Sequence, residues 1–227
     1  MQKADHSGHR ARMRERYLKS GLDSFAPHEI LELLLYYAVP YRNTNDIAKQ
    51  LIDRFGSLSA VFETPVDSLM EAGLTENQAI YLKLISDVTR AYYVDKYETD
   101  DGPVDYDSMP AYILSKFIGL GAEERVLLLL CDDKYKEVYC GFIAEGDLST
   151  TTLSLRRIIR LAVNNGARYA FLAHNHPSGV ALPSKADWES TKQIRDALAV
   201  VNVYLSDHFI VAGNECISLA DSNMFDD

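Results

Sequence analysis

Apolar residues recur at helical spacing through residues 10–93 of the chain. Leucine, isoleucine and alanine return every three or four positions, and this spacing predicts helices at 28–38, 45–55, 65–73 and 76–97. The second of these segments opens on the cap-type residue Asn45 and stops at Gly56. No strand pattern interrupts this part of the sequence, so residues 1–93 are predicted to form a helical domain.

Beyond residue 107 short apolar runs alternate with helical segments. The pattern predicts a strand pair at 126–131 and 138–143, a helix at 151–165, a strand at 168–174, a helix at 185–200 and one or two strands within 202–213. Strands that alternate with helices indicate an α/β layer structure, which we assign to residues 108–227. Ligand sites in such sheets favour the loops beyond the strand ends.

An acidic segment separates the two patterns. Residues 94–107 contain Gly102, Pro103 and few apolar side chains, a composition typical of a solvated linker. The whole chain has 227 residues, more than the roughly 100–200 of a usual single domain. Its 47% hydrophobic and 25% charged residues are typical of a globular protein. We therefore predict two domains with their boundary in this segment.

The net charge of −10 argues against a general nucleic-acid surface, because such surfaces use lysine and arginine to neutralise phosphates. One local exception is residues 1–20, where six basic residues outweigh two acidic ones. We interpret this segment as a solvated basic helix rather than a phosphate site. Any nucleic-acid site must therefore be local.

Three cysteines without CxxC spacing suit a reducing compartment, and we interpret them as small buried hydrophobic residues. No stretch reaches the roughly 18 apolar residues that a membrane span needs, and the N-terminus has no apolar signal region. We expect a cytoplasmic protein without a membrane partner.

The sequence FLAHNHPSGVALPSKAD at 171–187 carries the candidate chemistry. His174 and His176 end the predicted strand two positions apart, so their side chains point to the same side and can bind one ion. A turn follows, and Ser184 starts a helix that presents Asp187 in its first turn. Two imidazoles and one carboxylate leave a fourth position for water, as in catalytic zinc sites. The same donors also suit iron, cobalt or manganese.

Each piece also has a plainer interpretation. His174 and His176 could be partly buried polar residues at a strand end, and Ser184 with Asp187 could be a helix cap without chemistry. The strand, the two histidines, the turn and the helix start occur in one continuous run, and this conjunction favours the metal site.

This run matches the JAMM signature of the JAB/MPN metalloprotease-like superfamily: His174, Asn175 and His176, then seven residues, Ser184, two residues and Asp187. HNHPSG followed by PSxxD resembles its bacterial RadC branch. The resemblance extends to residues 207–221 and to FGSL at 55–58, and so covers nearly the whole chain. It implies an α/β fold in which a helical, helix-hairpin-helix-like domain precedes a JAB/MPN domain. That domain would have a mixed sheet flanked by helices in cytidine-deaminase-like layering.

The resemblance also implies an activity: one Zn²⁺ per chain, and hydrolysis of a peptide or isopeptide bond. A glutamate beside the metal-bound water would act as the general base; Glu124 fits best and Glu123 is the near alternative. Ser184 would donate a hydrogen bond to the developing oxyanion. Asp207 and His208 would either orient a ligand or serve a structural role.

The RadC resemblance brings a second functional hypothesis, a DNA-transaction accessory whose helical half binds DNA through a glycine-rich hairpin. The matching stretch here is 72–79, where Gly73 is kept but Glu76 and Asn77 occupy the following turn. Because Glu76 would repel a phosphate, this hairpin favours a packing or docking role. A third hypothesis is an MPN scaffold without turnover, against which the complete signature argues. The sequence names neither the substrate nor the oligomeric state.

Overall fold

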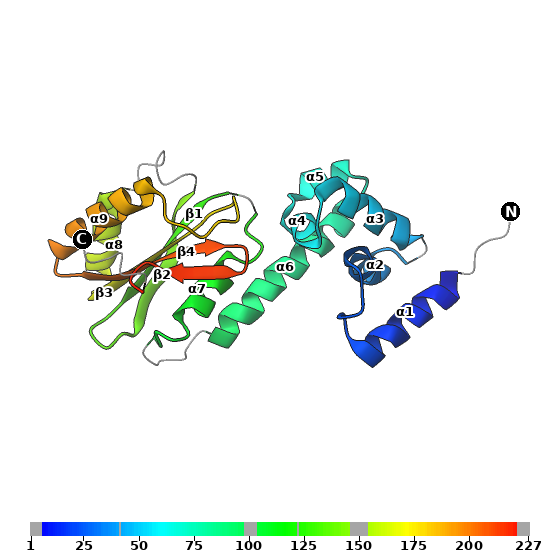
Figure 1. Cartoon of the computed structure of the whole chain (residues 1–227), viewed down its shortest axis with the longest axis horizontal. Helices are drawn as coiled ribbons and strands as arrows, with labels where there is room; N and C mark the ends of the chain where they lie inside the picture. Colours follow the sequence, from blue (N-terminus) through cyan, green and yellow to red (C-terminus); the bar gives the residue numbers. More distant parts are fainter. Residues whose placement is uncertain (1–5, 41, 98–103, 122, 146–153, 222–227) are drawn as a thin grey trace. The chain divides into compact units, whose positions relative to one another are not determined.

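The computed structural model describes residues 6–40, 42–97, 104–121, 123–145 and 154–221 (Figure 1). The chain divides into two compact units, Met1–Thr89 and Arg90–Asp227. The first is helical and the second is built on a five-stranded sheet, so the predicted fold class is confirmed. Within the described residues, no helix is both long enough and apolar enough to cross a membrane.

The helical unit holds a core of leucine, valine and alanine side chains. Its helices are α1 (His6–Ser20), α2 (Pro27–Ala38), α3 (Thr44–Phe55), α4 (Leu58–Glu63), α5 (Val66–Glu71) and α6 (Glu76–Tyr97), the last of which continues into the second unit. The cap of α3 is Asn43, whose side chain accepts a hydrogen bond from Asn45 N, so the prediction that Asn45 caps this helix is wrong. Helix α4 was not predicted separately; Ser57 caps it by accepting from Ala60 N.

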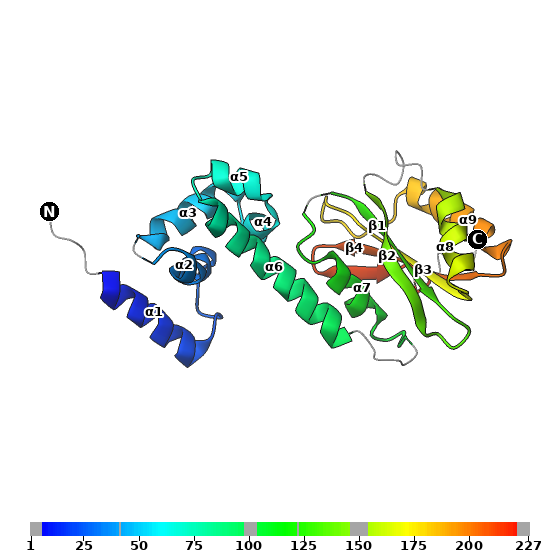
Figure 2. The same cartoon turned by 180° about the vertical axis from the view of Figure 1, so that it is seen from behind.

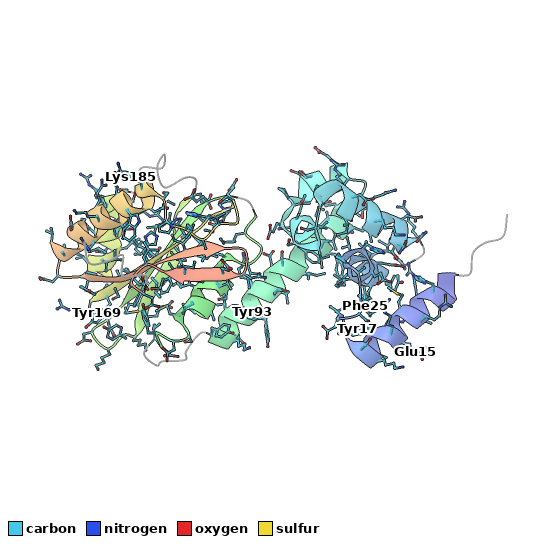
Figure 3. All side chains as sticks on the ribbon, in the orientation of Figure 1. Glu15, Tyr17, Phe25, Tyr93, Tyr169 and Lys185 are labelled. Carbon is cyan, nitrogen blue, oxygen red and sulfur yellow. The ribbon has the colours of Figure 1, made fainter. Side chains whose placement is uncertain are left out.

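The basic segment at the N-terminus is partly structural. Arg10 donates hydrogen bonds to the carbonyl oxygens of Val39, Pro40 and Arg42 at the end of α2. Arg16 pairs with Glu29 at 3.0 Å and lies over the ring of Phe25, which Figure 3 labels. Arg12, Arg14 and Lys19 are exposed, and Lys3 lies outside the described residues. Two of the predicted solvated cations therefore attach α1 to the rest of its unit.

The sheet of the second unit has the strand order β2-β1-β3-β4-β5. Its elements are α7 (Met109–Phe117), β1 (Arg125–Cys131), β2 (Glu137–Glu145), α8 (Leu155–Asn164), β3 (Tyr169–Asn175), α9 (Lys185–Ala199), β4 (Tyr204–Ala212) and β5 (Glu215–Ser218). Among the described strands, β3 and β4 pair in parallel and the other neighbours pair antiparallel, so the sheet is mixed. Figures 1 and 2 show α8 and α9 on one face and α7 on the other.

Helices on both faces explain the uninterrupted apolar run of β1. Val126, Leu128 and Leu130 pack with the side chains of α8 and α9. The alternate residues Leu127 and Leu129 pack with α7. A strand covered on both faces has no polar side, which is why its sequence does not alternate. The sequence interpretation did not identify α7, nine residues that follow the acidic segment.

The predicted linker lies only partly within the described residues. Residues 94–97 form the end of α6, where Tyr93 and Tyr97 stack with ring centroids 6.2 Å apart. Residues 98–103 lie outside the described residues, and Val104 N donates to Tyr135 O at 2.7 Å.

The three cysteines are free thiols. Cys131 is buried, while Cys140 and Cys216 are half-buried. Burial raises the pKa of Cys131 and of Cys216 to about 12, which keeps these thiols protonated. All three pack in or against the core on the α7 face of the sheet.

Candidate metal centre

The candidate site lies where β3 ends, β1 begins and α9 starts. Strand β1 runs antiparallel to β3 with Val126 opposite His174, so the residues just before β1 lie beside the end of β3. Glu124 is brought there by this register, although it is fifty positions from His174 in the sequence. Helix α9 presents Asp187 from its first turn. Among the described residues, Glu124, His174, His176 and Asp187 have ligand atoms that all lie within 4.8 Å of one another.

The two histidines face each other through their Nε2 atoms, 2.7 Å apart. This follows from the period of two along the strand, which places both rings on one side. His174 is fully buried, and 16% of the His176 side chain is exposed. His176 Nδ1 donates to the carbonyl oxygen of Val180 at 2.9 Å, and because a carbonyl only accepts, the neutral ring keeps its Nε2 lone pair.

Asp187 completes the group from the start of α9. Its side chain accepts a hydrogen bond from Ser184 N at 2.7 Å, while Asp187 N donates to Ser184 Oγ at 3.2 Å, which makes a capping box. Its carboxylate oxygens lie 3.3 Å from His174 Nε2 and 3.5 Å from His176 Nε2. Burial opposes ionisation of Asp187, but the His174 ring at 3.3 Å and the hydrogen bonds with Ser184 outweigh it and hold its pKa well below the usual value.

Of the two candidate bases, Glu124 lies in the cluster and Glu123 does not. Glu124 is half-buried and belongs to the converging group. Glu123 is 72% exposed and lies 3.7 Å from the Arg125 guanidinium. The register of β1 therefore separates these neighbours, which sequence alone left open.

Asn175, the residue between the two histidines, forms hydrogen bonds with the backbone on both sides of Glu124. Its Oδ1 accepts from Arg125 N at 2.7 Å, and its Nδ2 donates to Glu123 O at 3.0 Å. One amide side chain thus holds the backbone on both sides of Glu124. Sequence reasoning missed this contact, because it joins segments that only the sheet register brings together.

Ser184 lies beside the cluster rather than in it. It is exposed, and its hydroxyl oxygen accepts the backbone N–H of Asp187. The structure therefore places Ser184 as the cap of α9. Next to it, Lys185 projects into solvent with 91% of its side chain exposed (Figure 3).

Asp207 and His208 are adjacent on β4 but belong to different networks. Buried Asp207 accepts hydrogen bonds from the hydroxyls of Tyr106 and Ser218 at 2.8 and 2.5 Å, which secures the segment before α7 and strand β5. His208 is also buried, and its Nε2 lies 2.8 Å from His174 Nδ1. Burial lowers the pKa of His208 well below the usual value, so its ring is neutral. Asp207 is structural, whereas His208 contacts a candidate ligand.

The donor set fits a divalent transition metal ion. Zinc bound at roughly 2.0–2.1 Å by tetrahedral ligands keeps their atoms roughly 3.3 Å apart. The separations from Asp187 to the two histidines, 3.3 and 3.5 Å, agree with this value. The 2.7 Å between His174 and His176 is shorter, so the two rings must part by roughly 0.6 Å around the ion. Imidazole and carboxylate donors suit zinc and also iron, cobalt and manganese.

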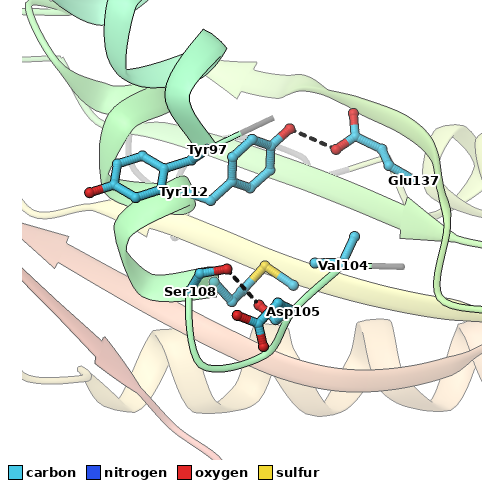
Figure 4. A pocket seen from close by; sticks show the side chains of 7 residues that line it. Tyr97, Val104, Asp105, Ser108, Tyr112 and Glu137 are labelled. Carbon is cyan, nitrogen blue, oxygen red and sulfur yellow. Dashed lines mark hydrogen bonds between the residues drawn. The ribbon is translucent and has the colours of Figure 1, made fainter. Parts of the chain in front are cut away.

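A separate pocket of about 180 Å³ lies at α7, on the face of the sheet opposite α8 and α9. Tyr112 donates its hydroxyl proton to Glu137 there at 2.6 Å, and Ser108 donates to the carbonyl oxygen of Asp105 (Figure 4). The described residues that line it include no histidine. This pocket therefore lacks the donors that converge at the end of β3.

Comparison with known proteins agrees with this geometry. The family model for the RadC-like JAB domain matches residues 105–224, which span the sheet and all four clustered residues. A UPF0758 protein of Fusobacterium nucleatum is 32% identical over 232 residues, covering 99% of this chain and all of the relative. UPF0758 proteins of Vibrio atlanticus and Vibrio cholerae are each 30% identical, covering 92% of this chain and 93% of each relative. The similarity includes the helical unit as well as the sheet.

Proposed function

Because the chain belongs to the RadC family of JAB-domain proteins, we propose that it is a zinc-dependent hydrolase of peptide or isopeptide bonds. The observation that carries the proposal is the convergence of His174, His176, Asp187 and Glu124 within 4.8 Å. Three of them supply a ligand set that leaves a position for water, and the fourth is a carboxylate placed to take a proton.

His174, His176 and Asp187 would hold the ion. A zinc ion bound there supplies a Lewis acid and lowers the pKa of bound water to near 7. The ligand atoms are presented from the end of β3 and the first turn of α9, so they lie close to their binding positions before any ion binds.

Glu124 is proposed as the general base. It would accept the proton of the attacking water and deliver it to the nitrogen of the leaving amine, so that the carbon–nitrogen bond breaks without releasing an amide anion. Asn175 would keep this carboxylate in place through its two backbone hydrogen bonds. Ser184 would donate its hydroxyl proton in a hydrogen bond to the oxyanion that develops on the scissile carbonyl.

The DNA hypothesis receives less support from the helical unit. At the turn between α5 and α6, Gly73 has φ +98°, the backbone conformation of a tight hairpin. Thr75 N, which a phosphate would need as a donor, already donates to the Gln78 side chain at 3.0 Å. Glu76 opens α6 with a negative charge where a phosphate would approach. These contacts favour a docking role for the hairpin.

Cleavage of a peptide library tests the proposed function. The purified chain, loaded with zinc, is incubated with a mixture of peptides and isopeptide-linked peptides, and the new amino termini are identified by mass spectrometry. We expect cleavage that a chelator abolishes and added zinc restores. Cleavage that persists in the chelator would contradict the metal-dependent mechanism. A zinc-loaded chain that cleaves neither kind of bond would support the scaffold hypothesis instead.

A further inference from the structure

We infer that His208 and Thr191 are positioning residues of the metal centre, which hold His174 in the tautomer whose Nε2 lone pair faces the ion. The inference rests on the metal site of the proposed function and adds two residues outside the JAMM signature. It concerns how a ligand is prepared for the metal, not the hydrolytic step.

The evidence is a chain of short contacts inside the unit. Thr191 Oγ1 lies 2.6 Å from the carbonyl oxygen of Asp187 and 2.6 Å from His208 Nδ1. His208 Nε2 lies 2.8 Å from His174 Nδ1. All four residues are at most 4% exposed. Unpaired polar atoms are costly at such depth, so each contact is expected to be a hydrogen bond.

The proton positions follow from Thr191. A hydroxyl group has one proton, and the carbonyl oxygen of Asp187 can only accept, so Thr191 donates to Asp187. The Thr191 oxygen must then accept from the Nδ1–H of His208. His208 is only 1% exposed, and such burial disfavours a charged ring. Its Nε2 is therefore an acceptor, and the Nδ1–H of His174 donates to it. His174 therefore keeps its lone pair on Nε2, the atom nearest Asp187 and His176. The Nε2 lone pairs of His174 and His176 then face each other at 2.7 Å, an arrangement that a cation bound between them would satisfy.

The opposite proton direction is disfavoured by the same distances. If Thr191 donated to His208, its oxygen would face the carbonyl oxygen of Asp187 at 2.6 Å with no proton between two acceptors. Hydrogen bonds in this opposite direction would also place a proton on His174 Nε2, which would block metal binding. Thr191 lies one helical turn after Asp187. Its hydroxyl therefore connects the helix that carries Asp187 to His208, whose ring contacts the ligand His174.

The zinc affinity of the protein measures the effect of these hydrogen bonds without requiring a substrate. Removing a group that orients a metal-ligating histidine typically weakens metal binding by roughly 10–100-fold. Thr191→Val keeps the side-chain shape but removes the hydroxyl, and Thr191→Ser restores it. The matched control is Thr89→Val, since Thr89 also donates to the carbonyl four residues earlier, Ile85 O at 2.8 Å, but lies in α6.

The experiment is a competition titration of the full-length variants against a chromophoric zinc chelator. We expect Thr191→Val to weaken zinc binding by roughly 10–100-fold, with Thr191→Ser and Thr89→Val close to wild type. Equal affinities for wild type and Thr191→Val would overturn the inference while leaving the metal site intact. If the wild-type chain bound no zinc, the proposed function would fail first, and the inference with it.

A second measurement needs no variant and covers the case in which Thr191→Val fails to fold. Nitrogen-15 NMR of the zinc-bound wild-type chain distinguishes protonated, unprotonated and metal-bound ring nitrogens. We expect both His174 and His208 to carry their proton on Nδ1. A His208 ring protonated on Nε2 would show that Thr191 and His208 do not set the tautomer of His174.

Discussion

Zinc is expected to stabilise the α/β unit, and His176→Ala is expected to abolish this effect. His176 is the most suitable ligand to remove, because 16% of its side chain is exposed whereas His174 and Asp187 are almost fully buried. The substitution also removes the hydrogen bond to Val180 O, so the metal-free variant is expected to be slightly less stable than wild type. The quantity to compare is therefore the change in melting temperature that zinc causes in each protein.

The expected size of this stabilisation follows if zinc binds the folded state and not the unfolded state. At a free zinc concentration one hundred times the dissociation constant, the free energy of unfolding rises by about 2.7 kcal/mol. The unit Arg90–Asp227 has an unfolding entropy of about 0.3 kcal/mol/K, at roughly 2.1 cal/mol/K per residue. The melting temperature of this unit should therefore rise by about 9 °C.

Scanning calorimetry of the chelator-treated protein, with and without added zinc, measures this shift. The control variant is His28→Ala, which changes a histidine of the helical unit and should leave the increase at its wild-type size. The same increase in melting temperature in His176→Ala would refute the assignment of this ligand set. So would the absence of any increase in the wild type at saturating zinc.

Three further predictions concern single features of the chain. Ser184→Ala should lower the free energy of unfolding by about 1 kcal/mol through loss of the α9 cap and still retain zinc; metal analysis showing zinc loss would contradict this. The pKa of Glu29 is lowered by hydrogen bonds from Arg16 and Ala26 N, so its stabilising effect is present above the ordinary pKa and disappears as pH falls through the lowered value. Glu29→Gln should therefore lower the melting temperature at pH 7 more than at pH 2.5, and equal losses would argue against this pairing. Duplex and branched DNA should bind the full chain more weakly than about 1 μM at physiological salt because of Glu76 and the net charge of −10; tighter binding in fluorescence anisotropy would favour the DNA hypothesis.

The sequence predicted the parts of the site that lie close together along the chain. The spacing of His174 and His176 placed both rings on one side of β3, and their Nε2 atoms indeed face each other. The helix start at Ser184 and Asp187 was also recognisable, because capping is a local interaction. Only the resemblance to a family pointed to Glu124.

Other features depended on packing that no local pattern encodes. Thr191 and His208 meet because α9 crosses β4, and Asn175 reaches the chain beside Glu124 through the register of β1 on β3. A helical threonine and a buried strand histidine each have a structural interpretation in isolation. The cap of α3 was misplaced by two residues for a related reason, since Asn43 and Asn45 are both good capping residues and only the backbone geometry separates them.

The most direct test of the account compares Glu124→Gln with Glu123→Gln. Both remove one carboxylate at adjacent positions, but only Glu124 belongs to the metal cluster, while Glu123 is exposed. Proteins with equal zinc content are compared by counting the new amino termini they produce in a bacterial proteome. We expect Glu124→Gln to keep its zinc and lose cleavage by at least roughly a hundredfold, with Glu123→Gln at the wild-type level. Wild-type cleavage by Glu124→Gln would contradict the role of Glu124 as general base.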